Sequence, residues 1–123
     1  MVAASSELWR ELVELASGVD SMGFRHIGKK IEYTPHTDLV KDLGLTGDDA
    51  FDFMEKFASK FTVEKGDYSS SDYFGPEGLN IFSFFKKDKP TMPITLGMLF
   101  LAARSGIWNR ELLQQAYNHQ NYE

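Results

Sequence analysis

Residues 42–61 read DLGLTGDDAFDFMEKFASKF, and the spacing of their apolar side chains predicts an amphipathic helix. The apolar side chains recur every three or four positions and form one stripe: Ala50, Phe53, Phe57 and Phe61. Thr46 can accept a hydrogen bond from a first-turn amide, and Asp48 and Asp49 place negative charge at the positive end of the helix dipole. We therefore expect a helix over residues 46–61 with its Phe-rich face in the core. The opposite face carries Asp52, Glu55, Lys56 and Ser59.

Two further helices are expected on either side of this segment. Leucines at helical spacing predict a helix over residues 6–17, and Gly18 is expected to end it. Asp67 is the expected cap of a short helix over residues 68–74, which the run GPEG at residues 75–78 ends.

Capping residues also define the C-terminal helices. Thr95 is expected to open a helix that stops at Gly106, because glycine readily adopts the left-handed conformation that follows a helix. Asn109 is expected to cap a last helix over residues 110–117. Residues 30–33 and 80–85 have the composition of short strands and could pair with each other.

Composition and length predict a single domain over residues 1–123. With 42% hydrophobic and 25% charged residues, the chain has enough apolar material for one modest core. Ten Phe, five Tyr and two Trp indicate a core built on ring packing, and the absence of cysteine excludes thiol catalysis, disulfides and thiolate zinc. We expect Trp108 to be buried, with an exposed interface role as the alternative.

The charge distribution favours a protein partner. A net charge of −5 does not suit a nucleic-acid binder, and residues 38–64 hold seven acids against three lysines, which is −4 of the −5. The basic run FFKKDKP at residues 84–90 is expected to form part of a solvent-exposed loop, with a phosphate contact as the alternative. The sequence has no membrane-length apolar run and no signal-peptide pattern, so the expected location is the cytoplasm, without membrane binding.

Metal and nucleophile chemistry have little support in the sequence. His26, His36 and His119 are far apart and have no partner at helical spacing, so no metal site is expected. The acids of DLGLTGDD lack the ligand spacing of a calcium loop. The three serines at residues 69–71 have no base in the same segment, so a capped turn is expected there and no catalytic residue is assigned.

The run DLGLTGDDAFDFMEKFASKF resembles the acyl carrier protein superfamily, whose recurring pattern is Asp-Leu-Gly, a variable residue and Asp-Ser-Leu-Asp, followed by a helix that closes on Phe. Without a gap, the matching residues are Asp42, Leu43, Gly44, Asp49, an acid at Asp52, and Phe61. The run PITLGMLFLAA is similar to the fourth helix of that family. The resemblance covers residues 37–74 and 93–106, with residues 6–17 as the first helix. It implies a mainly α, acyl-carrier-like four-helix bundle with a short third helix, to which the small two-stranded β element would be added.

The chain departs from that family at the modification site. The serine that carries phosphopantetheine falls on Gly47, and Thr46 and Asp48 replace its Asp and Leu neighbours. Glycine supplies no hydroxyl nucleophile, so no cofactor is expected.

The chain is also similar to a set of small, uncharacterised bacterial proteins of acyl-carrier-like type. The shared runs here are DLG with the helix that follows, YFGPEG at residues 73–78, and TLGMLFLAARSGIW at residues 95–108. That family has no assigned activity, so this resemblance implies a fold and no reaction.

We therefore expect a non-enzymatic, monomeric interaction module whose helix acids meet a basic patch on a protein partner. By resemblance to the carriers, the partner-binding residues are Asp48, Asp49, Asp52 and Glu55. An ordinary solvated helix face is the alternative explanation of these acids. Two other functions stay open: a small regulatory or immunity-type protein that blocks a basic site, and a genuine carrier modified at an atypical residue.

Overall fold

The computed structural model describes residues 2–22, 32–45, 47–74 and 92–122 of the chain. Within these residues the chain forms five helices, α1 (Val2–Met22), α2 (Gly47–Phe61), α3 (Ser70–Phe74), α4 (Leu96–Ser105) and α5 (Arg110–His119). The prediction of a mainly helical protein with a short third helix is thus confirmed. No helix of the described residues is long and apolar enough to span a membrane.

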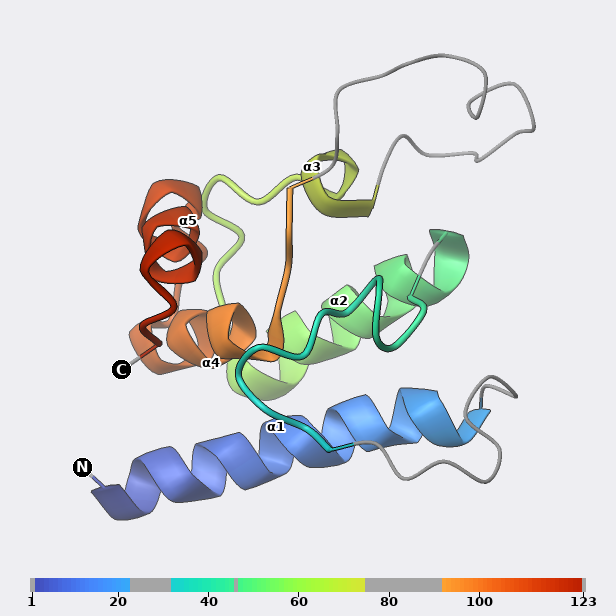
Figure 1. The fold of residues 1–123 in the computed structure, drawn as a ribbon, viewed down its shortest axis with the longest axis horizontal. Coiled ribbons are helices and arrows are strands. Elements are labelled where there is room, and N and C mark those ends of the chain that lie inside the picture. Colours follow the sequence, from blue (N-terminus) through green and yellow to red (C-terminus); the bar gives the residue numbers. More distant parts are fainter. Residues whose placement is uncertain (1, 23–31, 46, 75–91, 123) are drawn as a thin grey trace.

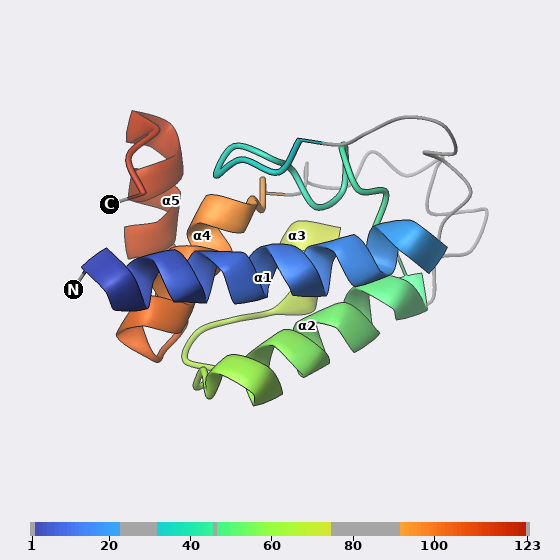
Figure 2. The ribbon, with the colours of Figure 1, turned by 90° about the horizontal axis from the view of Figure 1, so that it is seen from below.

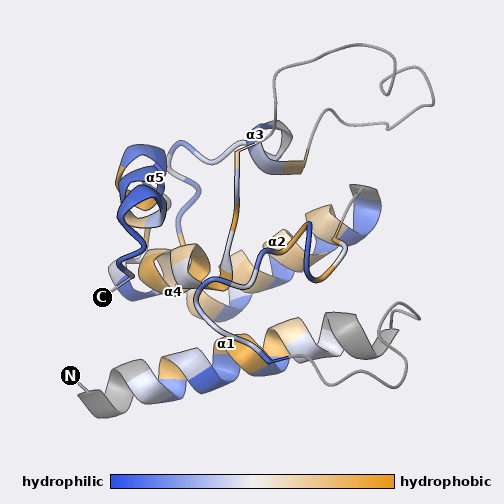
Figure 3. Cartoon of the chain, viewed as in Figure 1, coloured by the Kyte–Doolittle hydropathy of each residue, from blue (hydrophilic) through white to orange (hydrophobic). Residues whose placement is uncertain are grey.

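The helices pack around a shared interior (Figure 1). α1 runs along one side of the molecule and contacts α4, α5 contacts α4, and α3 contacts α2. Figures 1 and 2 both show α2 running in the opposite direction to α1. Apolar residues concentrate where α1, α2 and α4 meet, whereas α5 is largely hydrophilic (Figure 3).

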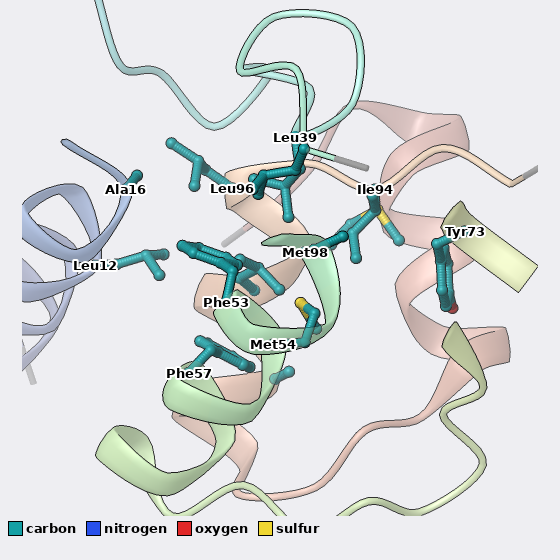
Figure 4. Close-up of a cluster of buried hydrophobic side chains, with 14 of the residues drawn as sticks. Leu12, Ala16, Leu39, Phe53, Met54, Phe57, Tyr73, Ile94, Leu96 and Met98 are labelled. Atoms are coloured by element: carbon teal, nitrogen blue, oxygen red, sulfur yellow. The ribbon is translucent and has the colours of Figure 1, made fainter. Parts of the chain in front are cut away.

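The core is built from side chains of every described segment (Figure 4). Leu12 of α1 and Phe53 and Phe57 of α2 are almost completely buried, because the apolar stripe of each helix faces the other elements. The first three members of the predicted α2 stripe are buried as expected, and Phe61 at the helix end is half-buried. Leu39 from the segment before α2 and Ile94 from the segment before α4 close the core together with Leu96 and Met98 of α4.

The segment before α2 is tied to the start of α4 by backbone hydrogen bonds. The Leu39 amide donates to the Ile94 carbonyl at 2.9 Å, and the Gly97 amide donates to the Pro35 carbonyl at 2.9 Å. A Cβ atom on Gly97 would lie 2.5 Å from the Tyr122 ring and 2.8 Å from the Pro35 oxygen, so only glycine fits this contact.

The Asp-Leu-Gly run forms the turn that leads into α2. The Asp42 carboxylate accepts a hydrogen bond from the Asp38 amide at 2.8 Å. Gly44 has a φ of 72°, a left-handed conformation that glycine adopts without strain. The turn buries Leu43 and Leu45 on either side of Gly44, and thereby anchors the chain just before α2.

The caps of the C-terminal helices are confirmed. The Thr95 hydroxyl accepts from the Met98 amide, and Gly106 follows α4 with a φ of 85°. The Asn109 side chain accepts from the Leu112 amide, and α5 continues beyond the predicted end to His119.

Two predictions about helix boundaries were wrong. α1 spans Val2–Met22 and not residues 6–17, because it begins before residue 6 and Gly18 does not end it. A glycine within a helix costs only about 1 kcal/mol relative to alanine, which packing of the helix can offset. Asp67 caps a different helix from the one predicted: its carboxylate accepts from the amide of Arg110, the first residue of α5, at 2.8 Å.

The remaining expectations fall partly outside the described residues. Glu32 and Tyr33 belong to no strand, whereas residues 30–31 and 80–85 lie outside the described residues, as does Thr46 with its predicted cap. Strand-like pairing in the described ranges is limited to isolated bridges, Asp38 with Thr95 and Glu64 with Ile107.

Candidate partner-binding surface on α2

The predicted partner-binding acids all lie on the solvent-facing side of α2. Asp48, Asp49, Asp52 and Glu55 are exposed. The burial of Phe53 and Phe57 fixes the rotation of α2, so the acids on the opposite side of the helix are forced outward.

The helical period divides these acids between two sides of α2. Residues at i, i+3, i+4 and i+7 share one side of a helix, which groups Asp48, Phe51, Asp52 and Glu55. We call these four residues the acidic stripe. Asp49 falls on the other side of the exposed surface, with Lys56 seven positions further along the helix.

The acidic stripe keeps most of its negative charge. The Lys56 ammonium lies 3.2 Å from the Asp52 carboxylate, but both side chains are about two-thirds exposed, and such surface pairs contribute little. Asp48 and Glu55 have no ion pair with any other described residue. The side of α2 that contains Phe51 is therefore more acidic than the side that contains Asp49.

Phe51 is the unexpected member of the stripe, because its ring is 53% exposed. It lies at the edge of an open groove of about 560 Å³, which the sequence did not predict. We call this cavity the α2 groove. Its walls come from α2, from the segment after α2 and from the connection between α4 and α5: Phe51, Met54, Ala58, Val63, Tyr68 and Trp108. Glu55, Glu64 and Lys65 add charged groups to the lining.

Three packed rings form what we call the aromatic wall, of which Tyr68 and Trp108 line the groove and Tyr73 lies buried behind them. Tyr68, Tyr73 and Trp108 lie with ring centroids 5.2 to 5.9 Å apart. The Trp108 indole Nε1 donates to the Tyr73 hydroxyl at 3.1 Å, and Trp108 is 2% exposed, so the prediction of a buried tryptophan is confirmed. Burial raises the pKa of the Tyr73 phenol, which keeps the hydroxyl neutral. The wall is therefore a fixed, uncharged aromatic surface.

Gly66 lets the backbone approach this wall. It has a φ of 55°, and a Cβ atom there would meet the Trp108 carbonyl oxygen at 2.1 Å. The backbone of Glu64 also pairs with the residues on either side of Ile107, through bonds to the Gly106 carbonyl and from the Trp108 amide. These contacts hold the segment after α2, which lines the groove, against the chain that follows α4.

The residues considered for covalent or metal chemistry are not brought together. α2 begins at Gly47, the position that the resemblance to the carriers aligns with their serine, and Ser69 and Ser70 are among the residues that line the groove. The His36 ring contacts the Tyr122 ring at 5.5 Å, and His119 ends α5. His26 lies outside the described residues, and no cluster of three metal-ligating side chains occurs within them.

The model of a family described as "Protein of unknown function (DUF1493)" matches residues 7–111. That range includes α2, the groove-lining segment after it and Trp108. No curated protein and no solved structure matches the chain.

Proposed function

We propose that this chain, which belongs to the DUF1493 family of proteins of unknown function, is a non-enzymatic module that binds a basic patch on a protein partner. The observation that carries the proposal is the acidic stripe, in which three carboxylates share one side of α2 with an exposed phenylalanine beside an apolar groove. Protein interfaces commonly combine a buried aromatic anchor with charged groups at the rim.

The carboxylates would act mainly on the encounter with the partner. Exposed charges steer association and suppress wrong partners, and they add less to the final affinity than a buried anchor does. Asp48, Asp52 and Glu55 are placed to act together with Phe51. Asp49 belongs to the proposed acids as well, in a more peripheral position on α2.

The module is acyl-carrier-like in this proposal, but without the prosthetic group. Support comes from the Asp-Leu-Gly turn that precedes α2 and from the glycine at its first position. In a carrier, the serine at the start of this helix holds phosphopantetheine. Here Gly47 would leave the start of α2 free for protein contact alone.

The regulatory or immunity-type alternative uses the same acids and differs in its partner. It requires one tight partner with a basic functional site, whereas a carrier-like module would engage biosynthetic enzymes. The identity of the captured protein therefore separates the two.

Charge reversal on the stripe tests the proposal. We expect the double variant Asp52→Lys/Glu55→Lys to lose captured partners from native lysate, measured by quantitative mass spectrometry, because the partner's basic patch would be repelled. The matched control is Glu7→Lys/Glu111→Lys, which changes the net charge equally at exposed positions of α1 and α5. Equal capture by wild type and the stripe variant, with an intact fold, would refute the proposal.

A further inference from the structure

The α2 groove combines an apolar interior with an acidic side. Met54, Ala58 and Val63 line it next to the aromatic wall, and Glu55 and Glu64 are the carboxylates of its lining, against Lys65. On one side it continues into the acidic stripe through Phe51 and Glu55, which belong to both. An occupant of the groove is therefore surrounded by apolar groups at its centre and mainly by negative charge at its edge.

We propose that the groove receives the apolar side chains of a basic amphipathic helix presented by the protein partner. The inference rests on the proposed function and deepens it by naming the segment that the partner presents. Lysine or arginine side chains flanking the apolar face of that helix would meet Glu55, Glu64 and the stripe carboxylates. Its apolar side chains would cover the exposed ring of Phe51.

The size of the groove fits several anchors. A cavity of about 150 Å³ holds one benzene ring, so 560 Å³ has space for about three apolar side chains. Helices that bind in grooves present anchors of this kind at i, i+3 or i+4, and i+7. A single inserted side chain would leave most of the groove unfilled.

Charge argues against a second copy of this chain as the occupant. Two copies that met through this face would oppose their acidic stripes, and each chain carries a net charge of −5. An anionic amphiphile would meet the same repulsion from Glu55 and Glu64. A basic helix is the occupant that satisfies both the apolar walls and the acidic edge.

Trp108 provides a reporter inside the groove. The chain has two tryptophans, and the variant Trp9→Phe leaves Trp108 as the only one. The probe is a synthetic peptide of about 15 residues, long enough to form a helix on binding. It has leucine at i, i+3, i+4 and i+7, lysine at the remaining positions, and no tryptophan. A peptide with glutamate in place of each lysine is its control.

We expect the lysine peptide to shift the emission of Trp108 until the shift saturates, which gives a dissociation constant. The glutamate peptide should leave the emission unchanged. Phe51→Ala should weaken binding by about tenfold or more, whereas Leu112→Ala, which truncates an exposed leucine on α5, should change it less than about twofold. Glu55→Lys should likewise weaken binding more than Asp49→Lys, the same charge change on the other side of α2.

Equal losses from Glu55→Lys and Asp49→Lys, or binding that leaves Trp108 emission unchanged, would overturn the proposal, because the peptide would then bind by general attraction. If octanol, which is neutral, shifts the emission of Trp108 and the lysine peptide does not, the groove would be assigned to a small apolar ligand. Self-association in sedimentation that Phe51→Ala abolishes would assign it to a second copy. Either assignment overturns the proposal.

The captured partners of the full chain separate this inference from the proposed function. If Asp52→Lys/Glu55→Lys loses those partners and Phe51→Ala retains them fully, the groove proposal fails and the proposed function stands. If both variants retain them, both proposals fail. Loss of the same partners in both variants, with Leu112→Ala unaffected, supports both.

Discussion

At the scale of single residues, two neighbouring tyrosines of the aromatic wall differ in their hydrogen bonding. The Tyr73 hydroxyl accepts from the Trp108 indole, whereas the Tyr68 hydroxyl is buried and has no hydrogen-bond partner among the described residues. Burial raises the pKa of both phenols, so both hydroxyls are neutral around neutral pH. Replacement by phenylalanine should therefore affect the free energy of unfolding differently at the two positions.

We expect Tyr73→Phe to lower the free energy of unfolding by about 1–3 kcal/mol, because it leaves the buried Trp108 Nε1 without an acceptor. Tyr68→Phe removes a hydroxyl that has no described partner, so we expect the free energy of unfolding to stay unchanged or to rise. Urea unfolding of the two variants measures the difference. Equal destabilisation by both would show that the Tyr68 hydroxyl is also paired in solution.

Gly47 bears on the carrier alternative at the same scale. Because glycine has no hydroxyl, we expect the chain to keep its unmodified mass when it is coexpressed with a broad-specificity phosphopantetheinyl transferase. Gly47→Ser alone should not restore modification, since such enzymes also read the neighbouring Asp and Leu, here Thr46 and Asp48. The triple change at positions 46–48 to Asp-Ser-Leu should restore modification more readily than Gly47→Ser alone, because it supplies the serine together with both neighbours.

Intact-mass spectrometry gives the answer, and a carrier protein with its serine is the positive control. A phosphopantetheine increment on the unaltered chain, at Thr46 or within residues 69–71, would promote the carrier alternative over the proposed function.

At the scale of elements, two of the four phenylalanines of α2 lie in opposite environments. Phe57 is 1% exposed in the middle of the buried stripe, whereas Phe51 is 53% exposed on the acidic stripe. Phe57→Ala should lower the free energy of unfolding by about 3–5 kcal/mol through the cavity that it leaves. Phe51→Ala should change it by less than about 0.5 kcal/mol, as at other surface sites. Thermal or urea unfolding compares them, and a costly Phe51→Ala with a neutral Phe57→Ala would mean that the rotation of α2 is wrong.

Local signals explain how far the elements could be predicted. The caps at Thr95 and Asn109 involve residues three positions apart, so composition and spacing were sufficient to find them. The prediction that Gly18 ends α1 was wrong, because a glycine weakens a helix without necessarily ending it. The Asp67 carboxylate accepts a hydrogen bond from the Arg110 amide, 43 residues away, and no local sequence pattern predicts such a contact.

The candidate site was predictable only in part, for the same reason. The four acids follow from the α2 pattern, because the burial of its Phe stripe forces them outward. The groove depends on α2, on residues 63–70 and on Trp108, which only the tertiary fold brings together. Phe51 was the one available signal, since a phenylalanine among acids on the polar side of a helix does not belong to the core stripe.

At the scale of the whole molecule, α2 contributes both to the core and to the surface groove. Its apolar side joins α1, α4 and the preceding turn in the core, and its acidic stripe borders the groove at the surface. The Asp-Leu-Gly turn anchors the chain at Leu43 and Leu45 just before α2, and the segment after α2 is held against Trp108. The proposed binding surface is therefore fixed by the same contacts that stabilise the fold.

Photo-crosslinking from α2 tests the central claim, that the acidic stripe is where a protein partner binds. A photoreactive phenylalanine analogue is placed at position 51, or at position 49 as the control on the other side of the same exposed surface, and irradiated in native lysate. We expect a protein adduct from position 51 that is weaker from position 49 and disappears when Asp52 and Glu55 are both changed to lysine. The same adducts in equal yield from both positions, or an adduct from position 51 that survives the charge reversal, would contradict it.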